Sequence, residues 1–259
     1  MYETLEIERA GKVATIWMNR PSVFNAFDEQ LIAELDAACR ELDADASVRI
    51  VVLGGRGRHF SAGADLNWMK RAAQFTTEQN LDDARRFAGM LRTLAEMGKP
   101  TIARIQGAAL GGGTGLAAAC DMAIADTMAV FSTSEVKFGI IPSAISPYVL
   151  RAIGPRHALR YFQSAERITA ERALAIGLVG EVVPPEQLDA VVAQLADALL
   201  LGGPQAQKAA KALIAAVHGQ KIDETISEET ARRIARQRAT DEAKEGIAAF
   251  LDKRTPGWI

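Results

Sequence analysis

The chain has 259 residues, of which 49% are hydrophobic and 24% charged, with a formal net charge of −2 at pH 7. These values are typical of one large globular domain, or of one domain with an appendage, and exclude a disordered chain. Neither nucleic acid nor a membrane is expected as a partner, and without a signal peptide or an apolar run of spanning length a cytoplasmic location is expected.

Short apolar runs alternate with helical patterns through the first half of the chain. Strand-like runs over 2–8 and 13–18, joined by a Gly-Lys turn, predict a hairpin. The further elements predicted up to residue 142 are a helix over 28–42, a buried strand over 48–54, a helix over 77–97, a strand over 101–105, a helix over 116–120 and a strand over 121–125. This order predicts an α/β fold.

After residue 142 the pattern becomes almost wholly helical. One strand is predicted over 179–183, and helices are predicted over 144–163, 170–176, 187–200, 204–218, 222–238 and 241–252. The run Gly202-Gly203-Pro204 predicts a hinge between a core over 1–201 and a helical region over 202–259. That region is too thin to bury a core alone, so we expect it to pack on the main domain or on a neighbouring subunit.

Three successive glycines, Gly111 to Gly113, separate the strand over 101–105 from the next helix. Glycine lets a ligand approach the backbone, and the first N–H groups of a helix attract anions, so Gly112 is placed to donate to an anionic oxygen. The run also suits a turn that packs a helix tightly on a sheet. Residues 113–118 further match the G-x-G-x-x-A dinucleotide fingerprint of oxidoreductases, although no acidic residue clearly ends a strand about 20 residues later.

A second glycine-containing loop over 60–66 also follows a buried strand and precedes a helix. Loops of this kind gather at one end of a parallel sheet, so backbone N–H groups from the two loops can meet at one oxygen. Asp65 is expected to cap the following helix. Cys39 and Cys120 lie far apart in apolar tracts, which predicts reduced core thiols and no metal site.

Five blocks of sequence resemble the crotonase (enoyl-CoA hydratase/isomerase) superfamily, in the order of that family and over nearly the full length. They are NRPSVFNAF at 19–27, HFSAGADL at 59–66, GAALGGGTGLAAACDMAIA at 107–125, SEVKFGIIP at 134–142 and EGIAAFLDKR at 245–254. The resemblance implies a spiral of ββα units with a C-terminal helical trimerisation region, in homotrimers or homohexamers. It also implies an acyl-CoA thioester substrate and no separate cofactor, since coenzyme A is part of the substrate.

The resemblance assigns catalytic roles to three residues. The N–H groups of Ala64 and Gly112 match the donors that hold the thioester oxygen, and Glu135 matches one of two catalytic glutamates. The second glutamate falls at Gly115, and we expect the missing side chain to leave room for water or for a branched substrate. Other matching positions are Ala62, Asp65, Leu66, Gly115, Ser134, Pro142 and Ser143 for the substrate, and Arg20, Val23, Phe250 and Lys253 for CoA.

A narrower resemblance links residues 111–121 and 134–154 to the bacterial 3-methylglutaconyl-CoA hydratase branch of leucine catabolism and to relatives in acyclic terpene breakdown. It implies hydration of a branched, carboxylated enoyl-CoA thioester. Two alternatives stay open. One is a Δ3,Δ2-enoyl-CoA isomerase, because one acid suffices for a 1,3-proton shift. The other is a catalytically weak acyl-CoA-binding oligomer, because Gly115 removes half of the usual acid/base pair.

Overall fold

The computed structural model describes residues 2–259, so residue 1 of the predicted core lies outside the described part. The predicted hairpin is present as strands β1 (Leu5–Ala10) and β2 (Val13–Met18), paired antiparallel. It continues into β3 (Ile50–Gly55), β4 (Thr101–Ile105), β6 (Met122–Asp126) and β9 (Glu181–Val183). The sheet order is β1-β2-β3-β4-β6-β9, and every pair after the hairpin is parallel.

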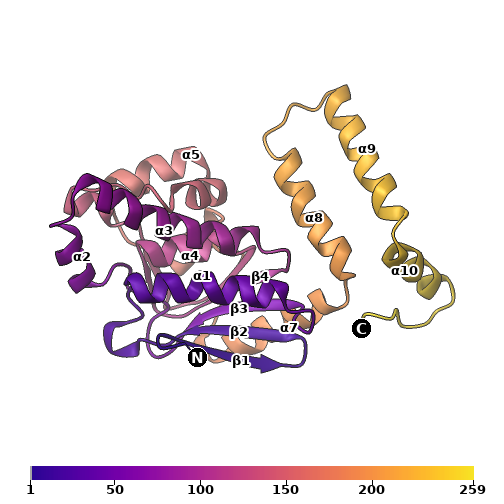
Figure 1. The fold of residues 1–259 in the computed structure, drawn as a ribbon, viewed down its shortest axis with the longest axis horizontal. Coiled ribbons are helices and arrows are strands. Elements are labelled where there is room, and N and C mark those ends of the chain that lie inside the picture. Colours follow the sequence, from indigo (N-terminus) through magenta and orange to yellow (C-terminus); the bar gives the residue numbers. More distant parts are fainter. Residues whose placement is uncertain (1) are drawn as a thin grey trace.

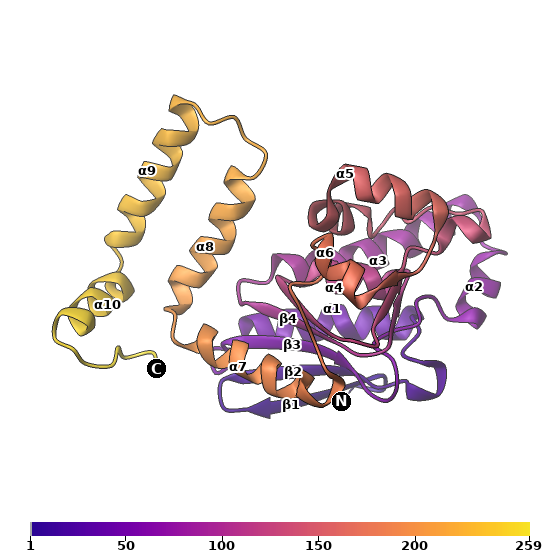
Figure 2. The ribbon, with the colours of Figure 1, turned by 180° about the vertical axis from the view of Figure 1, so that it is seen from behind.

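Helices cover both faces of this sheet (Figures 1 and 2). Helices α1 (Glu29–Ala44), α3 (Thr77–Glu96) and α4 (Gly112–Ala119) lie on one face, and α7 (Leu188–Leu200) lies on the other. Alternate residues of β3 serve the two cores: Val51 and Leu53 join the larger one, whereas Ile50 and Val52 pack toward α7. Burial on both faces explains why the strand reads as one continuous apolar run.

A second, three-stranded sheet was not predicted. It consists of β5 (Ala108–Leu110), β7 (Val130–Ser132) and β8 (Ile168–Thr169). Strands of two or three residues are too short to show a hydrophobic period, which is why the sequence pattern missed them. Helix α4 begins at Gly112 rather than at the predicted residue 116, because tertiary packing overrides the low helix propensity of glycine.

The remaining elements of the body connect the two sheets. They are the short helices η1 (Pro21–Val23), α2 (Leu66–Ala72), η2 (Glu135–Phe138), α6 (Ala170–Ala175) and η3 (Pro185–Gln187), and the longer α5 (Ser146–Ser164). Helix α5 has a kink at Gly154, whose φ of 71° is non-helical and which precedes Pro155. No helix within the described range is long and apolar enough to span a bilayer.

Helices α8 (Pro204–Val217), α9 (Glu224–Arg238) and α10 (Asp241–Leu251) form an arm that projects from the body (Figures 1 and 2). The predicted hinge at its base is held by side chains. Arg49 donates to the carbonyl of Gly202 at 2.5 Å, and Glu242 of α10 accepts from the backbone N–H groups of Gln205 and Ala206. Exposed apolar side chains along the arm are Ile214, Ile222, Ile234, Ile247, Phe250 and Leu251.

Candidate active site

The loop that carries Ala64 is fixed between two other segments. Phe27 donates its N–H to Gly63 at 2.7 Å and accepts from Asp65 at 2.8 Å, so that Phe27 and Ala64 form a parallel bridge. In such a bridge one residue bonds to both neighbours of its partner, so the N–H of Ala64 points away from Phe27. Within residues 2–259 this N–H donates to no other group of the chain.

The two glycine-containing loops contact each other through their backbones. Gly63 has a φ of 90°, and a Cβ at this position would lie 2.8 Å from the carbonyl oxygen of Leu110. Gly111 has a φ of 50° and turns the chain into α4, of which Gly112 is the first residue. Ala64 and Gly112 therefore each follow a residue at the contact. This juxtaposition supports the prediction that their N–H groups face one acceptor.

The glycine run also meets a packing requirement. A Cβ at Gly112 would lie 2.9 Å from ring atoms of both Phe27 and Phe87, and a Cβ at Gly113 would lie 2.7 Å from the carbonyl of Ser61. Any side chain here would push α4 away from the loop that carries Ala64. Tight packing and a free helix N-terminus are thus two properties of the same turn.

Glu135 places its carboxylate beside this turn. It is the first residue of η2, and its Oε1 lies 3.4 Å from the position that a Cβ on Gly111 would take. Its Oε2 is buried and has no hydrogen-bond partner in the described chain. Burial raises the pKa of this carboxyl above its ordinary value. A buried carboxyl group therefore lies next to the start of α4, as the prediction of a proton-transferring residue requires.

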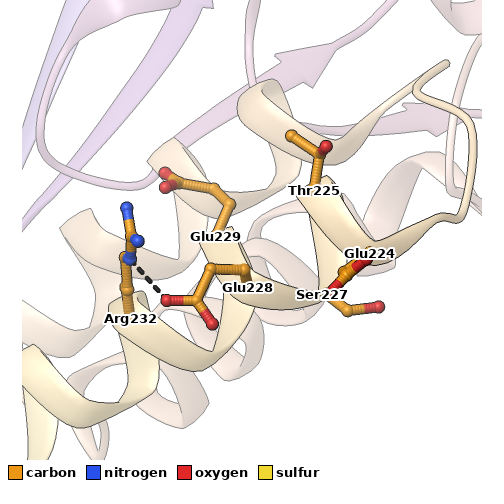
Figure 3. A pocket seen from close by; sticks show the side chains of 6 residues that line it. All are labelled: Glu224, Thr225, Ser227, Glu228, Glu229 and Arg232. Carbon is orange, nitrogen blue, oxygen red and sulfur yellow. Dashed lines mark hydrogen bonds and ion pairs between the residues drawn. The ribbon is translucent and has the colours of Figure 1, made fainter.

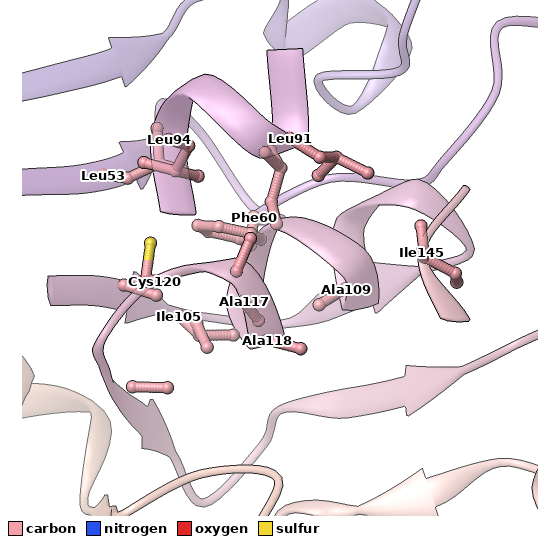
Figure 4. Close-up of a cluster of buried hydrophobic side chains, with 14 of the residues drawn as sticks. Leu53, Phe60, Leu91, Leu94, Ile105, Ala109, Ala117, Ala118, Cys120 and Ile145 are labelled. Atoms are coloured by element: carbon pink, nitrogen blue, oxygen red, sulfur yellow. The ribbon is translucent and has the colours of Figure 1, made fainter. Parts of the chain in front are cut away.

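The space beside Gly115 is occupied by Ile145, so the prediction of room for water or for a branched substrate there is wrong. A Cβ at Gly115 would overlap the Ile145 side chain, lying 2.7 Å from its Cβ. Ile145 is 2% exposed and belongs to the buried cluster around α4 (Figure 4). The sequence shows that position 115 lacks a side chain, but not that a residue 30 positions later fills the volume.

The other residues predicted to contact substrate occupy chain positions within or beside the segments described above. Asp65 caps α2 as predicted, since its Oδ1 accepts from the N–H groups of Asn67 at 2.8 Å and Trp68 at 3.3 Å. The remaining positions are Ala62 and Leu66, which flank the Ala64 loop, and Ser134, Pro142 and Ser143, which flank η2 and the segment after it. Their contacts with a substrate stay predictions.

The residues predicted to contact CoA lie in two distant parts of the chain. The Arg20 guanidinium contacts Ala26, Asp28 and Asp65, and Val23 is exposed to solvent on η1. Phe250 is 81% exposed at the end of α10, in the arm and away from α4 in both views (Figures 1 and 2). Phe250 and the nearby Lys253 therefore do not approach the Glu135 of their own chain.

Asn25 organises the same region, although no sequence motif assigns it a role. This residue is 0% exposed; its Oδ1 accepts from the N–H of Arg20, and its Nδ2 donates to the carbonyls of Arg56 and His59. An asparagine after Phe24 in the block at 19–27 was the available signal, because asparagine tolerates positive φ and bonds locally to backbone. Its φ is 55°.

A hollow on the arm contains none of the candidate site residues. It is lined by Glu224, Thr225, Ser227, Glu228, Glu229 and Arg232, all from α9 (Figure 3). Glu228 and Arg232 form an ion pair of 2.6 Å there, one helical turn apart. Among residues 2–259, no group of three or more His, Cys, Asp or Glu side chains is arranged to hold a metal ion.

Comparison with known proteins gives consistent matches over the whole chain. The sequence profile named Enoyl-CoA hydratase/isomerase matches residues 8–259. Crotonyl-CoA hydratase of Syntrophomonas wolfei is 35% identical over 266 residues, covering 100% of this chain and 98% of the relative. The 2,3-dehydroadipyl-CoA hydratase of Escherichia coli is 34% identical over 257 residues, covering 97% of each chain.

A solved structure gives the same result. The crystal structure of an enoyl-CoA hydratase from Shewanella pealeana superimposes with a TM-score of 0.96 at 41% identity, covering 99% of this chain and 96% of that one. The names of the two sequence relatives specify different acyl groups at nearly equal identity. Overall sequence identity to these relatives therefore does not indicate which acyl group this chain acts on.

Proposed function

This chain belongs to the enoyl-CoA hydratase/isomerase family, and we propose that it adds water across the double bond of an α,β-unsaturated acyl-CoA thioester. The chain adopts the predicted mixed α/β crotonase fold. Membership of this family rules out the interpretation of residues 113–118 as a dinucleotide-binding fingerprint. One observation carries the proposal: the Glu135 carboxyl lies beside the Gly111–Gly112 turn, and this turn packs against the loop that presents Ala64.

In the proposed reaction the thioester oxygen accepts hydrogen bonds from the N–H groups of Ala64 and Gly112. Negative charge develops on this oxygen when water attacks the β-carbon and an enolate forms. Each preorganised donor of this kind is worth about 10²–10³ in rate, and the positive end of the α4 dipole adds to the stabilisation. No separate cofactor enters this scheme.

Glu135 moves the protons. As a carboxylate it takes a proton from the attacking water, whose oxygen bonds to the β-carbon. The resulting carboxylic acid then gives a proton to the α-carbon as the enolate collapses, so that the net change is addition of one water molecule. Burial raises the pKa of Glu135, which brings its proton affinity closer to what both steps need near neutral pH.

We further propose that the acyl group is branched and 3-methylglutaconyl-like, as in leucine catabolism. The support is the resemblance of residues 111–121 and 134–154 to that branch. Ile145 occupies the space beside Gly115, so extra room at position 115 is not part of the support for this proposal. The name of one relative, 2,3-dehydroadipyl-CoA hydratase, shows that the family includes members named for a carboxylated acyl group.

We also propose that the arm mediates assembly into homotrimers or homohexamers. The support is the number of exposed apolar side chains on a helical region that has little core of its own. In such an assembly Phe250 and Lys253 would contact the CoA of a neighbouring subunit. Light scattering at micromolar concentration should give a mass three or six times 27.8 kDa. A sharp monomer would contradict the assembly.

One observation favours a second candidate function, Δ3,Δ2-enoyl-CoA isomerisation. One turn along α4 from the Gly111–Gly112 turn, the space beside Gly115 is filled by the apolar side chain of Ile145. Glu135 therefore has no second carboxylate from position 115 as a partner. A single carboxyl can take a proton from C2 of a 3-enoyl-CoA and return it to C4. The same two N–H groups would stabilise the dienolate, so this reaction needs no further residue.

A panel of purified thioesters separates these functions. Crotonyl-CoA and 3-methylglutaconyl-CoA should lose the absorbance of the conjugated thioester if the chain is a hydratase, whereas 3-hexenoyl-CoA should gain it if the chain is an isomerase. The variant Glu135→Gln should lose activity, and Glu96→Gln, which changes an exposed glutamate on α3, should retain it. Binding of CoA esters without turnover would support only an acyl-CoA-binding role.

A further inference from the structure

The guanidinium of Arg20 is enclosed by two segments of its own chain. Its Nη1 donates to the carbonyl of Ala26, and its Nη2 lies 2.7 Å from Oδ2 of Asp28 and 3.3 Å from Oδ2 of Asp65. The Arg20 side chain is only 18% exposed. These contacts tie the segment before α1 to the loop that carries Ala64.

Asp65 connects Arg20 to Ala64, because Asp65 contacts Arg20 and directly follows Ala64 in the chain. While its Oδ2 faces Arg20, its Oδ1 caps α2, and its own N–H donates to the carbonyl of Phe27. Burial acts to raise the pKa of Asp65, but the N–H groups of Asn67 and Trp68 and the Arg20 charge outweigh it and lower the pKa. The ionised Asp65 is thus held at side chain and backbone, directly after Ala64.

Arginine suits this position for a geometric reason. Its planar group presents several N–H donors in a rigid fork, so that one side chain can bridge a carbonyl and two carboxylates. A lysine has a single ammonium group and cannot make the same contacts with fixed geometry. Without a cation between them, the two carboxylates would repel each other and push the loops apart.

We infer that Arg20 is a positioning residue that holds the Ala64 N–H in place beside Gly112, and that it does not bind the CoA moiety. The inference rests on the proposed function, because it assigns Ala64 as a donor to the thioester oxygen. Small displacements of a group that contacts the reacting atoms cost rate rather than affinity for the remote part of the substrate.

Kinetics of Arg20→Met and Arg20→Lys distinguish positioning from CoA binding. Displacement of the Ala64 N–H should lower kcat about 10- to 100-fold, which does not exceed the loss expected when one oxyanion donor is removed. KM and the Kd for free CoA should change less than about threefold. Arg20→Lys should recover part of kcat. Arg9→Met removes an Arg–Asp pair of 2.7 Å far from the site and should leave kcat unchanged. A raised KM with weaker CoA binding and an unchanged kcat would overturn the inference.

Amide hydrogen exchange tests the same idea without using turnover. In Arg20→Met, exchange over residues 60–68 should accelerate at least several-fold, and Arg9→Met should leave this segment unchanged. Asp65→Asn should reproduce the acceleration, and the double variant should add little, because both changes break one network. Unchanged exchange over 60–68 would overturn the inference, even with lowered kcat. If the parent chain hydrates no thioester, the proposed function fails, while the exchange experiment still decides the role of Arg20.

Discussion

Replacing Gly115 by alanine should destabilise the protein, although glycine-to-alanine changes inside helices usually do the opposite. Position 115 lies in the interior of α4, where alanine is favoured over glycine by about 1 kcal/mol. The added methyl carbon, however, would lie 2.7 Å from Cβ of Ile145 and closer still to its Cγ2. Ile145 is buried and β-branched, so it cannot rotate away without disturbing other core residues.

The expected magnitude follows from these opposing terms. Overpacking a well-filled core costs about 1–3 kcal/mol, and overlap with two atoms of a stiff side chain places this site at the upper end. Subtracting the helix-propensity gain of about 1 kcal/mol leaves a net loss of about 2 kcal/mol. For a chain of this size, such a loss lowers Tm by about 4–8 °C.

Gly89 supplies a matched control for the measurement. It lies inside α3, and a Cβ there would meet nothing within 4 Å, so Gly89→Ala should raise the stability by about 1 kcal/mol. Thermal unfolding followed by circular dichroism, at equal protein concentrations, compares both variants with the parent chain. The two glycine-to-alanine changes should therefore shift Tm in opposite directions.

A second background tests the cause of the loss. In Ile145→Gly the nearest remaining atom of residue 145 is its Cα, 3.7 Å from the added methyl, so Gly115→Ala should there be neutral or stabilising. The reasoning is refuted if Gly115→Ala stabilises the parent chain as Gly89→Ala does. It is equally refuted if the loss persists in the Ile145→Gly background. By the same overlap, Gly115→Glu alone should destabilise α4 and add no useful carboxylate.

Three further predictions follow from the site and the arm. Because burial raises the folded-state pKa of Glu135, the stability of the parent chain should fall as pH rises through that pKa. The variant Glu135→Gln should remove this loss, so that its urea midpoint exceeds that of the parent only at high pH. The same variant should have a kcat about 10²–10⁴-fold lower. Equal pH dependence in both proteins would contradict it. Asn25→Ala leaves three backbone groups unpaired and should cost on the order of 3 kcal/mol or more in urea unfolding; a loss below about 1 kcal/mol would argue against its role. Glu242→Ala removes the acceptor for two N–H groups of α8 and should cost about 1 kcal/mol and promote dissociation on dilution, measured by light scattering; an unchanged mass and Tm would count against it.

Much of the fold was predictable because its signals are local. The hairpin strands and the long helices repeat their apolar residues with the period of a strand or a helix, and the buried strands are short continuous apolar runs. The structure places all of them in the predicted order. Asp65 was predicted as a cap, since a carboxylate before a helix accepts its first N–H groups. The glycine run likewise indicated a free helix start, and the matching blocks singled out Glu135.

Tertiary structure alone decided which distant residues share a volume. It placed Ile145 against Gly115, turned the Arg20 guanidinium inward to Asp65, and built the small sheet from strands too short to show a period. A sequence pattern reports which face of an element is buried, because period and polarity are properties of neighbouring residues. Which side chain fills a gap depends instead on how separate segments close on one another, and close packing leaves no room for two occupants.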